Sequence, residues 1–515
     1  MRLYHYQNVI KMSDDLLYVA HSTSPIFLNA RMANRHGLIA GATGTGKTVS
    51  LQVLAEAFSA EGIPVFMADV KGDLSGIGKQ GAMNKIIAAR TEEFGIMDFA
   101  FQSCPVCFLD VFEKQGHPLR STISKIGPLL LSRLLQLNDT QSGALNLVFR
   151  IADDKGWLLI DMKDIRAMLD YVGKNSKQFT TEYGSVAATS IGAIQRGLLT
   201  LEDQGGNVFF GEPAFELSDL IRTQNGKGLV NILAADRLMQ SPILYSTLLL
   251  WMLSELYETL PEVGDQPKPK LVFFFDEAHL LFNGAPKVLT DKIEQIVRLI
   301  RSKGVGVYFI SQSPSDIPDN ILGQLGNRIQ HALRAYTPRD QKAVKIAAQT
   351  FRPNPEIKTE QVITELAVGE ALVSFLDAAG RPSMVEHAKM LPPHSQIGPL
   401  TDDERATLIK NSIIFGKYEQ FFDRYSAFEL LRDQAAQAQE QQQLANAKNQ
   451  STPQPQTKPL PQQRQQPQQR SATKTTTRSQ KTGTGASIFN TVVKTMGSRQ
   501  GQQLVRGILG SLIKK

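Results

Sequence analysis

A glycine-rich segment at residues 41–48, Gly-Ala-Thr-Gly-Thr-Gly-Lys-Thr, constrains the fold of this chain more than any other stretch. It fits the pattern G-x-x-x-x-G-K-[ST], in which backbone amides surround the phosphates of a nucleotide. Glycines let such a loop close because they carry no Cβ atom. The apolar residues 38–40 before it predict a strand, and residues 49–60 predict a helix whose N-terminus faces the phosphates. The segment therefore predicts an α/β fold that binds a nucleoside triphosphate.

The residues of this loop have separate expected roles. We expect Lys47 to reach the β- and γ-phosphates, and the hydroxyl of Thr48 to hold Mg²⁺. The backbone amides of the loop and of the first helical residue, Val49, would surround the phosphates. The predicted phosphate-binding residues are Gly41, Ala42, Thr43, Gly44, Thr45, Gly46, Lys47, Thr48 and Val49.

A pair of acidic residues follows the apolar run at 271–275, Leu-Val-Phe-Phe-Phe. This run predicts a buried strand that delivers the carboxylates of Asp276 and Glu277 at its tip. Burying two carboxylates is costly unless a cation meets them, and Mg²⁺ together with Lys47 would supply that charge. The pattern matches the Walker B element. We therefore expect Asp276 to bind Mg²⁺ through water and Glu277 to polarise the attacking water.

A polar cluster also ends the strand predicted at 63–68. Together with the strand and helix around the glycine-rich loop, this strand completes a βαβ unit, which requires a parallel sheet. Such sheets bind ligands at the carboxyl ends of their strands. Asp69, Lys71 and Asp73 are therefore candidates for the nucleotide or Mg²⁺ shell, although a turn that caps a helix explains them equally well.

Two positions farther along the chain are candidates for contacts with the γ-phosphate. The strand predicted at 304–310 leads into Gln312, whose side chain could contact the γ-phosphate and report its loss. The helix before this strand carries Arg298 and Arg301. Glu294 lies one turn before Arg298 and offers it a surface ion pair. Arg301 has no such partner in the sequence and is the better candidate for a catalytic arginine.

Two pairs of residues have roles that the sequence leaves open. Arg35 and His36 stand immediately before the first core strand, and they suit a solvated connector, the nucleotide site or a subunit contact. Cys104 and Cys107 form a C-x-x-C pair. Because the chain has two cysteines, no second pair completes a zinc site, and we expect buried structural thiols in a reducing cytosol.

Charge and composition divide the 515 residues into parts. The formal net charge is +7, but residues 451–515 carry 11 Lys and Arg and no Asp or Glu, which leaves residues 1–450 at −4. The charge of the body therefore gives no support to nucleic-acid binding. The Gln- and Pro-rich stretch after it cannot bury enough apolar area to offset the entropy of ordering. The predicted parts are a lead-in at 1–36, an α/β core at 37–400 with a helical insertion at about 112–225, a helical extension at 401–435, a disordered linker at 436–485 and a basic amphipathic segment at 486–515.

The sequence contains no integral membrane segment that we can identify. The first twenty residues lack the continuous apolar region of a secretory signal, and no run reaches the 18 or so apolar residues of a membrane span. We therefore expect a cytoplasmic protein. The basic amphipathic segment 486–515 suits docking on the body, joining of subunits, peripheral contact with an anionic membrane or a protein partner, or holding DNA.

Taken together, these motifs closely resemble the HerA-like ATPases of the HerA/FtsK group of P-loop NTPases, and among them the bacterial YjgR-type family. The resemblance covers roughly residues 20–400 and extends to the helical segment at the end of the sequence. The residues that carry it are Arg35-His36-Gly37 with the loop at 41–48, the stretch 69–73, the stretch 276–279, Arg301 with Gly304, and Ser311-Gln312.

The resemblance implies a RecA-like core, assembly into a homo-oligomeric ring that could be a hexamer, and Mg²⁺-dependent hydrolysis of ATP. In rings of this group an arginine reaches the nucleotide of the neighbouring subunit, and Arg301 is the matching position here. The best-known members move double-stranded DNA. The resemblance thus points first to an ATP-driven DNA translocase or helicase-like motor.

Two other functions stay open. An ATPase that powers protein transport or assembly, as in secretion and conjugation, would use the same active-site residues. A nucleotide-dependent binding switch without useful turnover is disfavoured by Glu277, because a switch does not require a carboxylate that activates water.

Overall fold

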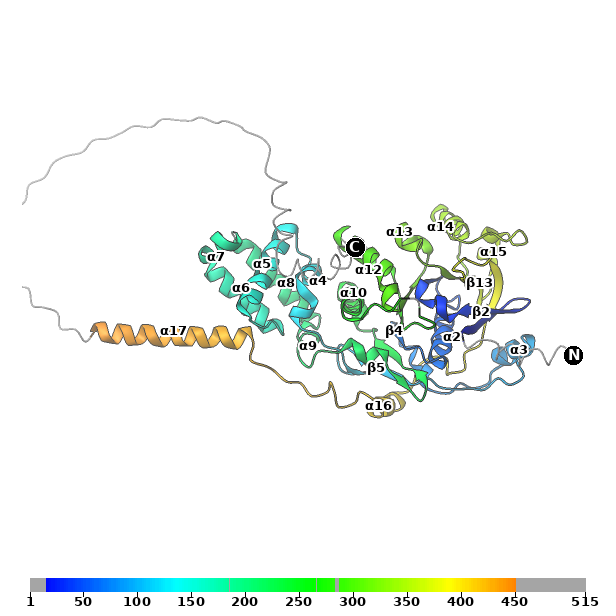
Figure 1. The fold of residues 1–515 in the computed structure, drawn as a ribbon, viewed down its shortest axis with the longest axis horizontal. Helices are drawn as coiled ribbons and strands as arrows, with labels where there is room; N and C mark the ends of the chain where they lie inside the picture. Colours follow the sequence, from blue (N-terminus) through cyan, green and yellow to red (C-terminus); the bar gives the residue numbers. More distant parts are fainter. Residues whose placement is uncertain (1–14, 185, 265, 283–286, 451–515) are drawn as a thin grey trace, which may run out of the picture. The chain divides into compact units, whose positions relative to one another are not determined.

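A twelve-stranded sheet dominates the computed structural model, which describes residues 15–184, 186–264, 266–282 and 287–450 (Figure 1). Its strands are β1 (Leu16–His21), β2 (Pro25–Asn29), β3 (Gly37–Ala40), β4 (Val65–Asp69), β5 (Val106–Asp110), β6 (His117–Pro118), β9 (Val230–Ala234), β10 (Leu271–Phe275), β11 (Val305–Ser311), β12 (Asn327–Gln330), β13 (Glu370–Ser374) and β14 (Glu386–Met390). A separate small sheet pairs β7 (Thr223–Gln224) with β8 (Lys227–Gly228).

The strands of the large sheet lie in the order β2-β1-β14-β13-β12-β3-β11-β10-β4-β9-β5-β6. All neighbours from β12 to β6 are parallel. The pairs that join β12, β13, β14, β1 and β2 are antiparallel. This arrangement confirms the predicted α/β fold with a mostly parallel central sheet.

Helices connect the strands. They are α2 (Lys47–Ala60), α3 (Lys85–Glu93), α4 (Ile123–Leu134), α5 (Asp139–Lys155), α6 (Met162–Lys174), α7 (Ser176–Tyr183), α8 (Ala188–Asp203), α9 (Gly206–Phe209), α10 (Pro242–Thr259), α11 (His279–Phe282), α12 (Lys287–Ile300), α13 (Asp319–Leu322), α14 (Pro338–Gln349), α15 (Thr359–Glu365), α16 (Asp402–Lys410) and α17 (Ala427–Gln450). Crossovers between parallel strands are right-handed. Because β3 to β4 and β9 to β10 run across the sheet in opposite directions, α2 covers one face and α10 covers the other.

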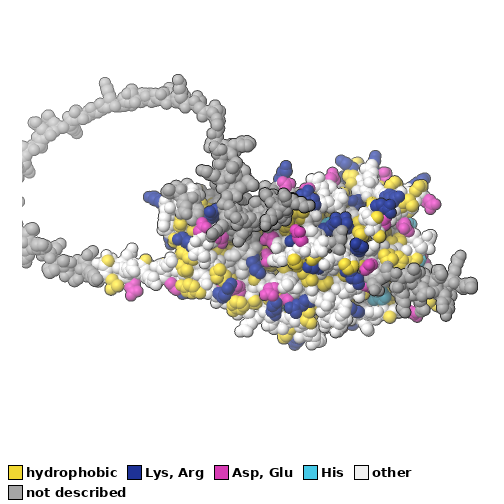
Figure 2. All heavy atoms as spheres, in the orientation of Figure 1, with side chains coloured by type: hydrophobic (Ala, Val, Ile, Leu, Met, Phe, Trp, Pro, Cys, Tyr) yellow, Lys and Arg dark blue, Asp and Glu magenta, His cyan; other side chains and the backbone are white. Residues whose placement is uncertain are grey.

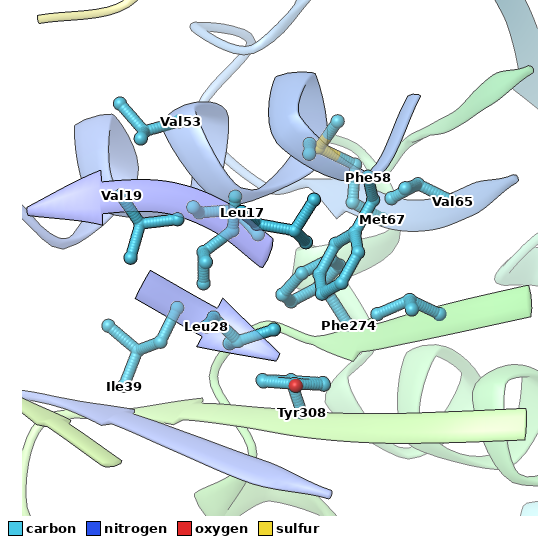
Figure 3. Packing of buried hydrophobic residues seen from close by; sticks show 14 of the residues in the cluster. Leu17, Val19, Leu28, Ile39, Val53, Phe58, Val65, Met67, Phe274 and Tyr308 are labelled. Carbon is cyan, nitrogen blue, oxygen red and sulfur yellow. The ribbon is translucent and has the colours of Figure 1, made fainter. Parts of the chain in front are cut away.

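One apolar cluster joins α2 to the sheet and to the β1–β2 hairpin. Figure 3 shows Val53 and Phe58 of α2 in one buried cluster with Leu17 of β1 and with side chains of the neighbouring strands. The ring of Phe58 lies 6.4 Å from that of Phe274 and 6.0 Å from that of Tyr308. Because side chains alternate between the two faces of a strand, this packing fixes which residues of β10 and β11 face α2, and with them the position of the P-loop helix.

The apolar runs of the sequence predicted strands at β3, β4, β10 and β11, but the pattern missed β2, β6 and β14. The β14 sequence is Glu-His-Ala-Lys-Met, in which only the third and fifth residues are buried. An antiparallel strand can keep one face polar, so its apolar signal is short and weak. In the range of the predicted helical insertion, 112–225, the structure describes helices α4 to α9. No helix among the described residues combines the length and the apolarity that a membrane span needs.

Both cysteines are buried and free, in line with the expected structural thiols. Burial raises the pKa of Cys104 and the pKa of Cys107 to about 12. A thiol with such a pKa stays protonated at neutral pH and is a poor nucleophile or metal ligand. The C-x-x-C pair therefore belongs to the packing of β5 (Val106–Asp110) and the segment before it.

The chain divides into two units, Met1–Ala427 and Phe428–Lys515. The predicted helical extension 401–435 is wrong for residues 411–426, which are not helical and form part of the first unit. The hydroxyl of Tyr418 donates to a carboxylate oxygen of Asp219 over 2.6 Å, and Lys417 donates to the same side chain over 2.8 Å. Adjacent residues of a helix do not face the same neighbour. The shared contact with Asp219 is therefore one reason why this stretch forms turns and bends instead of a helix.

Helix α17 corrects the predicted linker. The disorder expected from residue 436 is wrong for residues 436–450, because α17 continues to Gln450. This stretch is rich in Ala and Gln, which are strong helix formers. The rest of the predicted linker, 451–485, and the basic amphipathic segment, 486–515, lie outside the described residues.

Candidate active site

The glycine-rich loop connects β3 to α2 and holds its own lysine. Gly44 and Gly46 have φ angles of 77° and 111°, which residues with a Cβ rarely adopt. The ammonium group of Lys47 donates hydrogen bonds to the backbone carbonyls of Gly41, over 2.6 Å, and Ala42, over 3.0 Å. The hydroxyl of Thr45 donates to the carbonyl of Ala42 over 2.7 Å. These bonds shape the loop and keep the lysine at its mouth.

The backbone amides of this loop are available to a ligand. Within the part of the chain that the structure describes, no group accepts a hydrogen bond from the amides of residues 43–49. The first amides of a helix have no partner inside the helix, and they carry its partial positive charge. This combination suits a phosphate group, as the sequence predicted.

Residues far away in the sequence support the loop from behind. The backbone carbonyl of Thr45 accepts a hydrogen bond from the amide of Gly369 over 3.0 Å. A Cβ atom at Gly41 would lie 2.6 Å from the Cβ of His331, and one at Gly46 would lie 3.1 Å from the nitrogen of Gly369. The loop thus leaves no room for a side chain at Gly41 or Gly46, and it is in close contact with His331 and Gly369. No sequence signal distinguished them, because they become neighbours of the loop only through strand pairing.

His331 is a neutral histidine buried behind the P-loop. Its Nδ1 lies 2.8 Å from the carbonyl oxygen of Glu370, which can only accept, so Nδ1 carries the proton. Its Nε2 then accepts from the hydroxyl of Ser50 over 2.9 Å. Burial lowers the pKa of His331 from 6.5 to about 4, and the nearby charge of Lys47 lowers it further. The ring therefore stays uncharged at pH 7, so that Nδ1 can donate to Glu370 while Nε2 accepts from Ser50.

We predict that His331 makes the stability of the protein sensitive to mild acid. Between pH 6.5 and pH 4 the unfolded chain binds a proton at this residue and the folded chain does not, so the free energy of unfolding falls as the pH falls. The gap between 6.5 and about 4 corresponds to roughly 3 kcal/mol. Urea denaturation at pH 7 and pH 5 covers part of this interval and should show a loss of roughly 2 kcal/mol.

A comparison with His331→Gln isolates the effect from other groups. Burial also raises the pKa of Asp69 to about 6, and a carboxyl group with a raised pKa changes stability with pH in the opposite direction. The difference in pH dependence between the two proteins removes these shared contributions. We expect a flatter dependence in His331→Gln, and equal dependences would contradict the assignment of a neutral buried His331.

The acidic pair lies at the same edge of the sheet as the P-loop. Strand β11 separates β10 from β3, and all three are parallel, so their carboxyl ends meet at one edge. The charges of Glu277 and Asp276 act on Lys47, where they oppose the effect of burial, which lowers the pKa of the lysine. The structure therefore brings Lys47 and both carboxylates together, as the sequence predicted.

Asp276 carries a carboxyl group whose charged form is disfavoured by its surroundings. Burial raises the pKa of Asp276 to about 7, and the charge of Glu277 adds to the rise. Its Oδ1 accepts a hydrogen bond from the amide of Glu277 over 2.9 Å, and its backbone carbonyl accepts one from the hydroxyl of Tyr245 over 2.9 Å. The side chain is thus held in place at a point where a cation would stabilise its charged form.

Glu277 differs from Asp276 in its backbone conformation and in the neighbour of its carboxylate. Its φ angle is 47°, in the left-handed region that residues other than glycine rarely adopt. Its carboxylate oxygen Oε2 lies 3.3 Å from Nδ1 of His279, and its side chain is partly exposed. Unusual backbone angles of this kind are frequent at active sites. The turn therefore places the two acids differently: both residues are half-buried, and Oε2 of Glu277 is a buried oxygen without a hydrogen bond to any described group.

The residues at this edge fit a magnesium ion. Mg²⁺ binds oxygen ligands and is usually held by one or two protein groups, with phosphate and water as the others. Thr48 and Asp276 provide a hydroxyl and a carboxylate, which are oxygen ligands of the kind that this ion prefers. Thr48 and Asp276 would hold the ion, which supplies charge stabilisation to the phosphates when it is bound.

The other predicted residues at this edge have distinct places. Gln312 follows β11, next to Ser311, whose carbonyl accepts a hydrogen bond from the amide of Gly41 over 3.2 Å. Its side chain is exposed beside the P-loop. The carboxylate of Asp69 accepts from the amides of Asp73 and Leu74 over 3.0 and 3.1 Å. Asp69 therefore closes a turn, in line with the second interpretation of the sequence, and its carboxylate is already occupied by two backbone amides.

Lys71 lies close enough to this site for its charge to act on both of the central groups. It lowers the pKa of Lys47, and it also lowers the pKa of Asp276. A second cation beside the lysine of the P-loop suits a ligand with several negative charges. Of the three candidates in the turn after β4, Lys71 is the one whose charge reaches the phosphate site.

Arg301 lies on the opposite side of the sheet from the P-loop, at the edge where the parallel strands begin instead of the edge where they end. It begins the short helix η5 (Arg301–Lys303), directly before β11 starts, whereas the P-loop follows the carboxyl end of β3. Arg301 lines a cavity of about 400 Å³ together with Arg35, His36, Arg298 and Arg328. No Asp or Glu is among the described residues that line this cavity. Figure 2 shows Lys and Arg side chains gathered over the region between α12 and α14.

Comparisons with known proteins agree with this geometry. The family model described as "Helicase HerA-like C-terminal" matches residues 15–515. The chain belongs to this family of HerA-like P-loop ATPases. A curated relative, "Probable helicase MJECL08" of Methanocaldococcus jannaschii, is 30% identical over 125 residues, which are 24% of this chain and 22% of that protein. This HerA-like ATPase thus matches about a fifth of the length of that relative.

Solved structures show the same fold. One is described as the bacterial conjugative coupling protein TrwBdeltaN70 in an unbound form; it is 16% identical, with a TM-score of 0.50, over 73% of this chain and 89% of that chain. Another is the plasmid coupling protein TrwB in complex with the non-hydrolysable GTP analogue GDPNP, at 15% identity and a TM-score of 0.50, over the same shares of the two chains. At these identities the likeness shows that the HerA-like ATPase has the predicted RecA-like fold, and nothing further.

Proposed function

We propose that this HerA-like ATPase is a Mg²⁺-dependent motor that hydrolyses ATP within a homo-oligomeric ring, a hexamer in its simplest form, and moves double-stranded DNA in the cytoplasm. The observation that carries the proposal is the meeting of Lys47, Asp276 and Glu277 at one edge of the sheet. These three groups are the ones that ATP hydrolysis by a P-loop enzyme requires.

Each residue has a role in this proposal. Lys47 and the amides of residues 43–49 bind the triphosphate and stabilise the charge that develops on it. Thr48 and Asp276 hold Mg²⁺. Glu277, whose carboxylate oxygen Oε2 lies 3.3 Å from Nδ1 of His279, orients and polarises the attacking water. Gln312 contacts the γ-phosphate from the strand between the two motifs.

The place of Arg301 supports assembly of several subunits. An arginine that stabilises the transition state must reach the phosphates, and Arg301 lies at the sheet edge opposite its own P-loop. A head-to-tail ring brings one edge of each subunit against the other edge of the next. In such a ring, Arg301 of one subunit completes the site of its neighbour.

We infer double-stranded DNA as the substrate from the resemblance to the HerA/FtsK group, and the names of the relatives support a nucleic acid. Both the family description and the curated relative name a helicase. We predict that linear double-stranded DNA increases steady-state ATP hydrolysis several-fold at low salt. The stimulation should weaken as salt rises, because contacts with phosphate release counterions. A coupled assay of phosphate release, with and without DNA, measures it.

The variant Lys47→Ala is the control, since it should remove both basal and DNA-stimulated hydrolysis and thereby exclude a contaminating ATPase. Hydrolysis that depends on Lys47 but responds to no nucleic acid at low salt would contradict the DNA motor. It would favour an ATPase that powers protein transport or assembly, which needs the same active-site residues.

A further inference from the structure

His36 joins three elements through a buried imidazole. It directly precedes β3, the strand that leads to the P-loop. Its Nδ1 lies 3.0 Å from the backbone nitrogen of Val307 in β11, and its Nε2 lies 2.7 Å from the carbonyl oxygen of Val297 in α12. The residue is 3% exposed. It is therefore not the solvated connector that was one reading of its position in the sequence.

The two hydrogen bonds define the state of the ring. A backbone amide can only donate, so Nδ1 accepts from Val307 and the proton of the neutral ring lies on Nε2, which donates to the carbonyl of Val297. Burial lowers the pKa of His36 to about 4, and the charges of Arg301 and Arg35 lower it as well. At neutral pH the ring is therefore an uncharged clamp with one donor and one acceptor, both in use.

The backbone at His36 is strained to make these contacts. Its φ and ψ angles are 61° and 169°, a region that is populated almost only by glycine and that costs a side-chain-bearing residue about 1–3 kcal/mol. The backbone carbonyl of His36 accepts from both the amide and the side-chain nitrogen of Asn327, each over 3.1 Å. A Cβ atom at Gly37 would lie 2.3 Å from the ring of Tyr308. The chain is thus pressed tightly against β11 at this point.

We propose that His36 is a positioning residue for Arg301: its imidazole holds the end of α12 at a fixed place on the P-loop strand and so sets how Arg301 meets the nucleotide of the neighbouring subunit. The inference rests on the proposed function, in which Arg301 acts across a subunit interface. Val297 lies in the last turn of α12, and Arg301 follows it by four residues. Both His36 and Arg301 line the same cavity.

The distance from the clamp to the arginine is short enough for this control. Four residues of helix span about 6 Å, so Arg301 lies close to the clamp. A shift of the helix end by a given distance therefore moves Arg301 by about the same distance. A displacement of about 1 Å at a catalytic group can reduce the rate about 100-fold. Nucleotide binding should not change, because the P-loop lies at the other edge of the sheet.

The test begins with His36→Gln, whose amide can still donate toward Val297 but cannot replace both ring nitrogens. We expect kcat to fall roughly 10- to 100-fold while the Kd for a fluorescent ATP analogue stays within about twofold. His36→Gly removes the clamp together with the backbone strain, and it provides a second variant if the first fails to fold. The matched control is His117→Gln, which alters another buried histidine, bonded to Glu419 at the far end of the sheet.

Mixed oligomers distinguish positioning from a general loss of structure. His36→Gln subunits have an intact P-loop and a misplaced arginine, so mixing them with Lys47→Ala subunits should restore hydrolysis. Mixing them with Arg301→Ala subunits should not, because neither partner then supplies a working arginine. Equal behaviour in the two mixtures would overturn the inference, as would a normal kcat in both His36 variants.

The mixture of Arg301→Ala with Lys47→Ala shows which proposal has failed. If this mixture recovers activity and the one with His36→Gln does not, Arg301 acts across the interface but His36 does not position it. If the Arg301→Ala mixture also fails to recover, the role of Arg301 across the interface is wrong, and the role of His36 falls with it.

Discussion

The variant Glu277→Gln should bind ATP normally and hydrolyse it roughly 10²- to 10⁴-fold more slowly, which is the usual contribution of a general base. The amide keeps the size of the side chain but cannot accept a proton. The backbone of Glu277 adopts a φ angle of 47° and its side chain is partly exposed, so the substitution leaves packing largely unchanged. Single-turnover hydrolysis and equilibrium binding of a fluorescent ATP analogue measure the two quantities separately.

The neighbouring acid gives the matched comparison. Asp276→Asn changes the buried partner, whose pKa burial raises to about 7, and it should weaken the binding of Mg²⁺ as well as hydrolysis. The Mg²⁺ concentration at half-maximal activity should therefore rise in Asp276→Asn, whereas Glu277→Gln should leave the Mg²⁺ dependence of ATP binding unchanged. Normal turnover in Glu277→Gln would show that another group positions the water.

The sequence predicted the phosphate site because both of its motifs are local. Residues 41–48 form one continuous loop, and Asp276 and Glu277 directly follow one apolar run. Their meeting did not require a knowledge of every strand: parallel strands that are joined by helices place their carboxyl ends at one edge. The strand order, with β11 between β3 and β10, adds that Gln312 ends the strand between the two motifs.

The supporting residues could not be predicted in the same way. His331 and Gly369 follow the loop they support by nearly 300 residues or more. No local pattern marks a histidine whose partners are a side-chain hydroxyl in α2 and a backbone carbonyl in β13. His36 was noticed in the sequence, but its role depends on contacts with Val297 and Val307. Such roles depend on tertiary packing, which a periodic pattern does not record.

The non-helical stretch 411–426, which consists mostly of turns and bends, was mispredicted for a related reason. Its neighbours Asp402–Lys410 and Ala427–Gln450 are helical, and its charged residues suit a helix surface equally well. Its conformation is decided by partners elsewhere: Tyr418 and Lys417 both reach Asp219. A competing tertiary contact outweighs the small differences in helix propensity, which stay below about 1 kcal/mol for most residues.

Mixing Arg301→Ala subunits with Lys47→Ala subunits should restore hydrolysis that neither variant shows alone. An arginine that acts across an interface increases the rate about 10³- to 10⁵-fold, so Arg301→Ala alone should be nearly inactive. Lys47→Ala alone lacks the lysine that would contact the phosphates. The structure separates the two groups to opposite edges of the sheet, which is the arrangement that lets one variant supply what the other lacks.

The size of the recovery follows from the geometry of a head-to-tail ring. In a random equal mixture, about a quarter of the interfaces join an intact P-loop to an intact Arg301. We therefore expect up to about a quarter of wild-type activity per subunit, measured as steady-state phosphate release after the subunits are coexpressed and purified together. Arg334→Ala with Lys47→Ala is the control mixture, since Arg334 donates a hydrogen bond to the backbone carbonyl of Thr364. If the mixed Arg301→Ala oligomers stay as inactive as their parents, Arg301 does not serve a neighbour, and the arginine that completes the site must lie elsewhere in the chain.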